Sequence, residues 1–161
     1  MTVRRMTLGD VDDIYAIECA SFHTPWSRES FVSEMTTNKC ARYMVAEENG
    51  RAVAYAGAWL VLEEGHITNI AVAEEYRRQG LGQAVTRALM QYASNLGVQY
   101  MTLEVRRSNM AARHLYESLG FVQLGVRKGY YEDTGEDGLL MVCDKLPEPD
   151  PDFTEEETAE E

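Results

Sequence analysis

A short loop with two arginines and two glycines is where residue types and spacing point most directly to chemistry. Arg77 and Arg78 precede Gly80 and Gly82, and a long segment with helical periodicity follows at once. The N–H groups in the first turn of a helix lack acceptors within the helix and lie at the positive end of its dipole. Glycines let this backbone approach an anion closely, and phosphate is the usual anion at such a site. The spacing predicts a phosphate-binding turn, although an ordinary strand–turn–helix with solubilising arginines would carry the same residues.

The two best-known phosphate-binding patterns do not occur in the chain. There is no GxxxxGK(S/T) stretch, which excludes a P-loop. There is also no GxGxxG followed about 20 positions later by an acidic residue, which argues against dinucleotide binding by that route.

A carboxylate and a phenol follow the loop at positions suited to proton transfer. Glu104 lies between apolar neighbours near the end of the alternating stretch 101–105, and Tyr116 lies in the next helical segment, which Asn109 begins. A carboxylate and a phenol beside an anion site suit a general base and a general acid. Each residue also has an ordinary interpretation, as a solvated strand-end glutamate, a packed tyrosine and an N-cap asparagine.

Hydrophobic periodicity and turn residues predict the elements that must position these groups. Asn49-Gly50 indicates a two-residue hairpin, and Glu64-Gly65 indicates a second turn. Helices are expected from a Thr7 cap to about Ser21, after a Ser27 cap, from Leu81 to Gly97, and from Ser108 or Asn109 to Gly120. Strands are expected at 2–6, 42–48, 51–63, 66–72, 100–105, 121–130 and 139–145. This order predicts an α/β fold with a central mixed sheet and helices on its faces.

Composition limits the classes of function. The 161 residues are 45% hydrophobic, which suits one compact domain, and the net charge of −12 with a pI near 4.7 disfavours nucleic-acid binding. Three distant cysteines without Cys or His partners at metal spacing predict no disulfide framework and no metal site, as in a reducing cytoplasm. Neither a membrane-spanning stretch nor a signal peptide is expected.

The C-terminal residues differ from the rest of the chain. Residues 147–161 contain three prolines, eight acidic residues and no basic residue, so residues 1–146 carry only the other −4 of the net charge. We therefore expect one domain over 1–146 and an acidic, disordered tail over 147–161.

Taken together, the motifs resemble those of the GNAT superfamily of N-acetyltransferases. The resemblance rests on the segments 77–82 (Arg-Arg-Gln-Gly-Leu-Gly), 103–109 (Leu-Glu-Val-Arg-Arg-Ser-Asn) and 115–121 (Leu-Tyr-Glu-Ser-Leu-Gly-Phe). Within the superfamily, 25–27 (Pro-Trp-Ser), 69–72 (Asn-Ile-Ala-Val) and 127–131 (Arg-Lys-Gly-Tyr-Tyr) resemble the RimI type, the bacterial ribosomal-protein-alanine N-acetyltransferases. The resemblance covers residues 2–146. It implies a mostly antiparallel seven-stranded sheet with one splayed parallel pair, flanked by four helices.

The resemblance implies that acetyl-CoA binds between the two splayed strands, with no metal. The backbone of Ile70, Ala71 and Val72 would pair with the pantetheine arm and hold the thioester carbonyl. Glu104 would be the general base, and Tyr116 the acid that protonates the leaving thiolate. Since no cysteine occupies a matched catalytic position, we expect direct transfer in a ternary complex. The remaining cofactor contacts would come from Arg77, Arg78, Gln79, Gly80, Leu81, Gly82, Gln83 and Asn109.

The acceptor is expected to enter between the loop 23–27 and the loop 130–137. Trp26, Tyr130 and Tyr131 would form an aromatic wall there, although Trp26 also suits a packing role. The implied substrate is the N-terminal alanine of a small-subunit ribosomal protein, with no direct nucleic-acid or membrane partner and a cytoplasmic location. A monomer and a weak dimer both remain open. Alternatives are the same chemistry on other protein N-termini, lysine side chains or small amines, an acyl-CoA-binding module without turnover, and an interaction protein that uses its tail.

Overall fold

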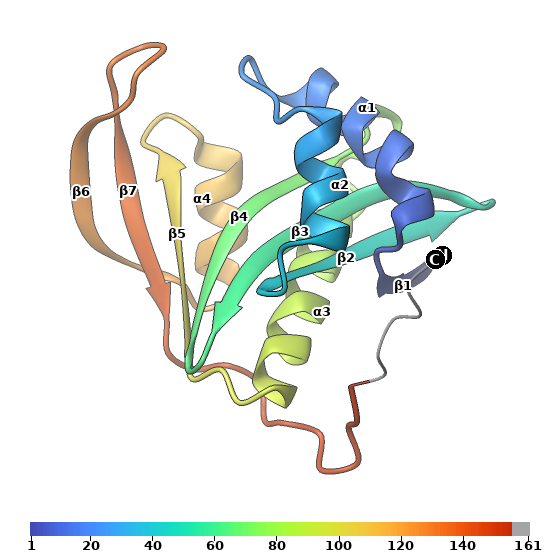
Figure 1. The fold of residues 1–161 in the computed structure, drawn as a ribbon. Helices are drawn as coiled ribbons and strands as arrows, with labels where there is room; N and C mark the ends of the chain where they lie inside the picture. The colour runs from blue at the N-terminus through green and yellow to red at the C-terminus, as the bar shows by residue number, and fades with distance from the viewer. Residues whose placement is uncertain (156–161) are drawn as a thin grey trace.

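A computed structural model describes residues 1–155, in which seven strands form a single sheet (Figure 1). The spatial order is β1-β2-β3-β4-β5-β7-β6, and every neighbouring pair is antiparallel except β4 and β5. This confirms the predicted fold. The strands are β1 (Thr2–Arg5), β2 (Ala41–Glu48), β3 (Arg51–Val61), β4 (Glu64–Val72), β5 (Tyr100–Arg106), β6 (Val122–Tyr131) and β7 (Glu136–Cys143).

Four α-helices in this part of the chain cover the two faces of the sheet. They are α1 (Val11–Ser21), α2 (Arg28–Thr36), α3 (Leu81–Asn95) and α4 (Met110–Ser118), and short 3-10 helices occur at Leu8–Asp10 and Glu74–Tyr76. In Figure 1, α1 and α2 lie in front of the sheet, and α3 and α4 lie behind it. Because both faces are covered, the central strand β3 is an almost continuous buried run rather than an alternating one. Searching residues 1–155 for a helix long and apolar enough to cross a bilayer finds no candidate.

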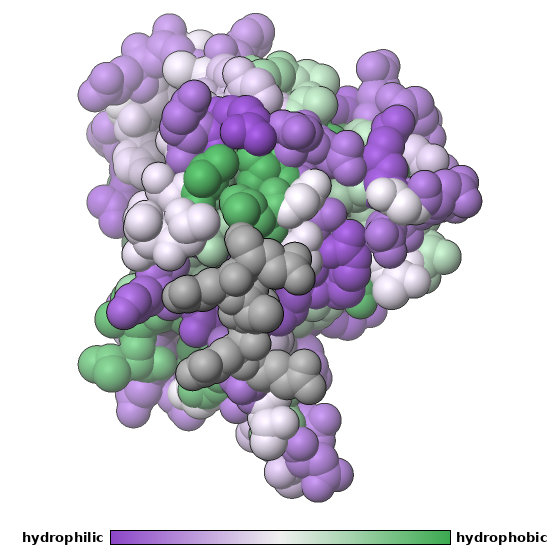
Figure 2. Space-filling model, turned by 45° about the vertical axis from the view of Figure 1, so that its right-hand side comes forward, coloured by the Kyte–Doolittle hydropathy of each residue, from purple (hydrophilic) through white to green (hydrophobic). Residues whose placement is uncertain are grey.

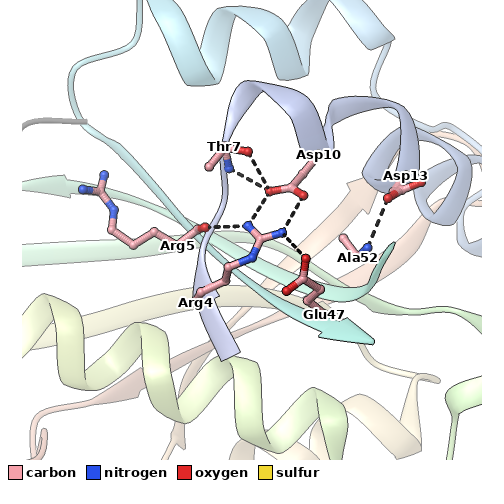
Figure 3. A network of polar contacts seen from close by, with 7 residues as sticks. All are labelled: Arg4, Arg5, Thr7, Asp10, Asp13, Glu47 and Ala52. Carbon is pink, nitrogen blue, oxygen red and sulfur yellow. Dashed lines mark hydrogen bonds and ion pairs between the residues drawn. The ribbon is translucent and has the colours of Figure 1, made fainter. Parts of the chain in front are cut away.

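Polar side chains fix the starts of α2 and of the segment that leads into α1. Ser27 Oγ accepts the N–H of Ser30 at 3.1 Å at the start of α2, as its sequence position predicts. Before α1, the carboxylate of Asp10 accepts two bonds from the guanidinium of Arg4, at 2.8 and 2.9 Å, and one from the N–H of Thr7 at 2.8 Å (Figure 3). This buried cluster fixes α1 to β1 and leaves the other end of the helix to meet β3 and β4.

The first predicted turn is confirmed and the second is displaced. Asn49 and Gly50 have φ of 53° and 77°, as a tight two-residue hairpin requires. The prediction of a turn at Glu64-Gly65 is wrong by two residues, because the chain turns at Leu62 and Glu63, and Leu62 takes a φ of 54°. Gly65 is needed for space, since a Cβ there would lie 3.1 Å from the side chain of Met101 in β5.

The parallel pair β4–β5 separates soon after it forms. Its register covers only Glu64↔Tyr100, Gly65↔Met101 and His66↔Thr102. Directly afterwards the β3–β4 register shifts between Gly57 and Ala58, which produces a bulge in β4. Beyond the bulge, β4 keeps β3 as its partner on one side and leaves its β5-facing edge without a strand.

The first part of the acidic tail lies along α3. Gln91 Nε2 donates to the carbonyl of Glu148 at 2.9 Å, and Phe153 packs perpendicular to Tyr92 with ring centroids 5.3 Å apart. Glu155 accepts from both Arg42 and Tyr92 at 2.8 Å. Residues 147–155 thus differ from the disorder expected of the whole tail, because one acidic and one aromatic side chain meet partners on the domain. Residues 156–161 lie outside the described part of the chain.

Hydrophilic residues cover most of the face shown in Figure 2. Hydrophobic residues appear there as separate small areas, which agrees with a chain in which charged residues make up 26%.

Candidate active site

The start of α3 forms an open backbone surface suited to an anion. Gly80 is the N-cap residue, with φ of 77°, and Arg78 takes a left-handed φ of 63°. The bond from Ala84 N–H to the Gly80 carbonyl, at 3.0 Å, begins the helical pattern, so the preceding N–H groups point out of the helix end. A Cβ at Gly80 would meet no atom within 4 Å. This surface fits the diphosphate that the sequence predicts for it.

The second glycine of the loop has a different reason. A Cβ at Gly82 would lie 3.4 Å from Leu115 and 3.7 Å from Val72. Gly82 therefore lies between α4 and the end of β4, at distances where a Cβ would make ordinary van der Waals contacts. Leu81 is buried beside it and anchors the first turn of the helix.

The polar side chains of the predicted cofactor site divide into two groups. Arg78 and Gln79 are exposed on the loop. Arg77 instead turns back and donates from Nε to the Val72 carbonyl at 3.1 Å. Gln83 donates to Ser118 Oγ at 3.3 Å, and Asn109 caps α4 by accepting the N–H of Ala112 at 3.1 Å. Arg77, Gln83 and Asn109 thus hold parts of the site in place through protein contacts.

The predicted acetyl-CoA strand segment lies where β4 has left β5. Ala71 pairs with Tyr55 of β3, and the last β4–β5 pair is at His66. Backbone groups of Ile70 and Val72 therefore face the widening gap between the strands, because Ala71, like Ala73, has its backbone groups on the side of β3. An extended chain with amide groups can bond to such an edge as an added strand.

Glu104 lies across this gap, on β5. Its side chain is 11% exposed and is held at both oxygens, by His66 Nε2 at 3.1 Å and Arg127 Nε at 3.2 Å. His66 Nδ1 lies 2.9 Å from Thr102 Oγ1, which can donate to it when Nε2 carries the ring proton. The carboxylate is thus oriented by residues from β4, β5 and β6.

Tyr116 lies on α4 and is almost fully enclosed, with 9% of its surface exposed. Burial, and next to it the proximity of the Tyr131 phenol, raises the pKa of Tyr116 well above its ordinary value. Burial likewise raises the pKa of Tyr131 to about 12, and Glu104 is among the groups that act on it electrostatically. The Tyr131 phenol therefore interacts electrostatically with both Tyr116 and Glu104.

The predicted aromatic wall is only partly assembled. Tyr130 and Tyr131 are perpendicular, with centroids 5.0 Å apart, and together they border the site from β6. Trp26 contacts Phe31 at 5.7 Å and Trp59 at 6.4 Å between ring centroids. Those contacts fit the packing role of Trp26, while its other edge lines a groove of about 660 Å³ beside α2.

The acidic loop between β6 and β7 is largely neutralised. Asp133 accepts from Arg106 at 2.7 Å, and Asp137 lies 3.8 Å from Arg107. The Arg106 guanidinium also lies 4.1 Å above the ring of Tyr131. These contacts attach the loop to β5, and its carboxylates Asp133 and Asp137 are already paired with arginines of the protein.

Sequence reasoning missed the groups that hold Glu104. His66 stands at the strand start without any motif, and only the parallel register places it opposite Thr102, two residues from Glu104. Arg127 was part of a family motif, but its contact with Glu104 depends on the irregular register of β6 against β7 that begins at Arg127. Among residues 1–155, no group of three His, Cys, Asp or Glu side chains is arranged to hold a metal ion.

Comparison with known proteins gives relatives along nearly the whole chain. A protein of Bacillus subtilis is 42% identical over 139 residues, covering 86% of this chain and 92% of its own, and is named as a candidate ribosomal protein bS18-alanine N-acetyltransferase. The Escherichia coli K12 enzyme named ribosomal protein bS18-alanine N-acetyltransferase is 39% identical over 144 residues, covering 87% and 95%.

The same resemblance is found in three dimensions. The crystal structure of the ribosomal-protein-S18-alanine N-acetyltransferase from Escherichia coli superposes with a TM-score of 0.82 at 34% identity, covering 95% of this chain and 98% of that one. The acetyltransferase (GNAT) family model matches residues 11–121. This range includes the bulged strand β4, Glu104, Tyr116 and the open backbone surface around Gly80 at the start of α3, which we call the α3 cradle. The chain therefore belongs to the GNAT family of acetyltransferases.

Proposed function

We propose that this protein transfers the acetyl group of acetyl-CoA to the N-terminal alanine of a small-subunit ribosomal protein of the bS18 kind. The observation that carries the chemistry is the position of Glu104, which faces the free edge of β4 across the gap between the strands. The acceptor class is supported by the relatives in Bacillus subtilis and Escherichia coli, whose names carry that activity.

Acetyl-CoA, the acetyl donor that GNAT acetyltransferases use, would be held by backbone at two places. The N–H groups at the start of α3, around Gly80, receive the diphosphate, and exposed Arg78 adds positive charge. The β5-facing edge of Ile70–Val72 bonds to the amides of the pantetheine arm. One of these N–H groups also holds the thioester carbonyl oxygen, where negative charge grows during attack.

We assign the proton transfers to Glu104 and Tyr116. Glu104 holds the acceptor ammonium and takes one proton, and the neutral nitrogen forms a bond to the acetyl carbon. The nitrogen then loses a second proton to solvent, and the carbon–sulfur bond breaks. Burial raises the pKa of Tyr116, so the phenol is protonated when the thiolate departs, and we assign it the transfer of that proton to the thiolate. The proton taken by Glu104 passes to solvent, and Tyr116 is reprotonated from there.

An N-terminal amine suits this weak base better than a lysine does. An α-amine has a pKa of about 7.7–8.0 and is partly neutral at pH 7, whereas a lysine near 10.4 requires about 3.4 kcal/mol more to lose its proton. We assign the transfer to residues 1–146 and its location to the cytoplasm, where ribosomal proteins are made. Residues 147–155 lie along α3, and none of them is among the residues assigned to the site.

An acceptor panel tests the proposal. The full-length protein is incubated with acetyl-CoA and hexapeptides that begin Ala-Arg, with the same peptides already N-acetylated, and with lysine-bearing N-acetylated peptides. Mass spectrometry locates any added acetyl group. Acetylation only of free N-termini is expected. Modification of lysine alone would support the alternative acceptor class, and absence of any transfer would leave only acyl-CoA binding.

A further inference from the structure

A buried glutamate outside the proposed chemistry contacts β4, the strand that borders the proposed site. Glu18, on α1, is only 2% exposed. Its carboxylate accepts a hydrogen bond from the hydroxyl of Tyr55 on β3 and lies 3.5 Å from the amide nitrogen of Asn69 on β4. The backbone N–H of Trp26, in the loop between α1 and α2, lies close enough to this carboxylate to act on its pKa, which it lowers. One side chain therefore joins four segments of the chain.

The opposite end of the Asn69 side chain is fixed as well. Asn69 Oδ1 accepts from Thr68 Oγ1 at 2.8 Å and from the Tyr43 hydroxyl at 3.2 Å. Tyr43 reaches Asn69 from β2 by lying across Gly57 of β3, where a Cβ would come within 2.3 Å of the tyrosine ring. The Asn69 amide is thus held from both sides in a fully buried row.

The position of this row in the sheet gives it a consequence for the site. Asn69 follows the bulge at which β4 turns away from β5, and Ile70 begins the free edge proposed to hold acetyl-CoA. Trp26 lies on the loop under which the acceptor is proposed to enter. Glu18 therefore interacts with both sides of the space in which amine and thioester must meet.

We propose that Glu18 is a positioning residue that couples the α1–α2 loop to the bulge of β4 and so sets the distance between acceptor and thioester. This inference rests on the proposed function. A buried carboxyl costs folding energy unless its oxygens are bonded, and here its interactions link two substrate-binding segments rather than neighbours on one helix. Misplacement of reacting groups by about 1 Å can cost about 100-fold in rate, which is the scale expected here.

The test compares two substitutions of Glu18 with a matched control. Glu18→Ala removes every bond and should lower kcat by about 10- to 100-fold, with the KM for acetyl-CoA nearly unchanged. Glu18→Gln keeps an oxygen that can accept from the Trp26 N–H, so most of kcat should return. Asp10→Asn is the control, because Asp10 is also a buried acid, at the other end of α1, and contacts neither substrate segment. It should lower the melting temperature while leaving kcat unchanged. All assays run well below the lowest melting temperature.

A double-mutant cycle with Asn69→Ala tests the route of the effect. If Glu18 acts through Asn69, Asn69→Ala alone should lower kcat, and Glu18→Ala in the Asn69→Ala background should cause little further loss. Multiplicative losses, or a kcat for Glu18→Ala equal to that of the wild type, would overturn the inference. Should Glu18→Ala fail to fold, Asn69→Ala tests the same route, and a kcat equal to that of the wild type would overturn the inference. Wild-type protein that transfers no acetyl group would instead overturn the proposed function itself.

Discussion

The guanidinium Nε of Arg127 lies 3.2 Å from Oε1 of Glu104, while the other carboxylate oxygen faces His66. The group proposed to bind a cationic amine is thus already paired with a cation of the protein. Arg127 is about half exposed, so an entering ammonium can displace it toward solvent at small cost.

Replacing Arg127 by alanine should therefore strengthen acceptor binding. Because an exposed ion pair is worth at most about 1 kcal/mol, we expect the acceptor KM to fall by up to about fivefold, with the KM for acetyl-CoA unchanged. Steady-state kinetics with the Ala-Arg hexapeptide measures this, with Lys128→Ala as the neighbouring control. A raised acceptor KM would mean that Arg127 binds the peptide rather than competing with it.

Glu104→Gln should abolish most of the turnover and spare the cofactor. The amide keeps the shape of the side chain but cannot take a proton, so kcat should fall by about 10²- to 10⁴-fold. Calorimetric titration with coenzyme A should give an unchanged Kd, because the proposed diphosphate contacts lie on α3. Turnover equal to that of the wild type would remove Glu104 from its role.

Gly80→Ala should weaken acetyl-CoA binding specifically. The new Cβ would project into the open surface at the helix start, and a left-handed alanine costs about 1 kcal/mol of stability. Gly50→Ala is a close control, since Gly50 has the same φ of 77° and equally open surroundings in a distant hairpin. Both variants should lose similar stability, but only Gly80→Ala should raise the Kd for coenzyme A. Equal Kd values would contradict the proposed cradle.

Two buried acids should contribute to stability with opposite pH dependence. Burial raises the pKa of Glu18 above 4.5, so its contribution is lost as pH rises through the folded-state pKa. Burial of Asp10 is outweighed by bonds from Arg4 and Thr7, which lower its pKa below 3.8, so its contribution is lost as pH falls below that value. Urea unfolding from about pH 3 to 8 measures the free energy of unfolding of each protein. As pH rises, the wild type should lose stability relative to Glu18→Gln. As pH falls, it should lose its greater stability over Asp10→Asn. Parallel curves for both variants would contradict these assignments.

Deleting residues 147–161 should lower the melting temperature without lowering activity. The deletion removes the Phe153–Tyr92 pair, worth about 0.5–1.5 kcal/mol, which corresponds to a few degrees in a chain of this size. The contacts that the tail makes with α3 lie on the C-terminal half of that helix, which is about 22 Å long, whereas the proposed diphosphate site lies at the start of the helix. Deleting only 156–161 keeps every described tail contact and is the control. Loss of activity per folded molecule would show that the tail reaches the site.

Local sequence signals predicted those parts of the fold that local interactions decide. Ser27 and Asn109 cap their helices by their own side chains, and Asn49-Gly50 sets its hairpin by backbone preference. The second turn was misplaced because Gly65 looks like a turn residue, whereas its missing side chain serves the close approach of Met101 from a strand 36 residues later.

The candidate site was predictable only where the family motifs name its residues. The role of His66 depends on a parallel register of three residue pairs, and that of Glu18 on a bulge and on a helix-to-sheet contact spanning 51 residues. The tail contacts depend on Tyr92 and Arg42, which lie far from the tail in sequence. Such long-range relationships leave no periodic trace in a single sequence.

The brevity of the β4–β5 pairing has a mechanical meaning. Only three residue pairs join strands β1–β4 to strands β5–β7 in the sheet, and they lie beside the β3–β4 hairpin. A rotation of the two groups of strands about this short pairing would change the width of the gap between β4 and β5 without breaking the hydrogen bonds within either group. Acetyl-CoA bonded to the free edge of β4 would fix the width of this gap, so the bound substrate itself would complete the geometry of the site.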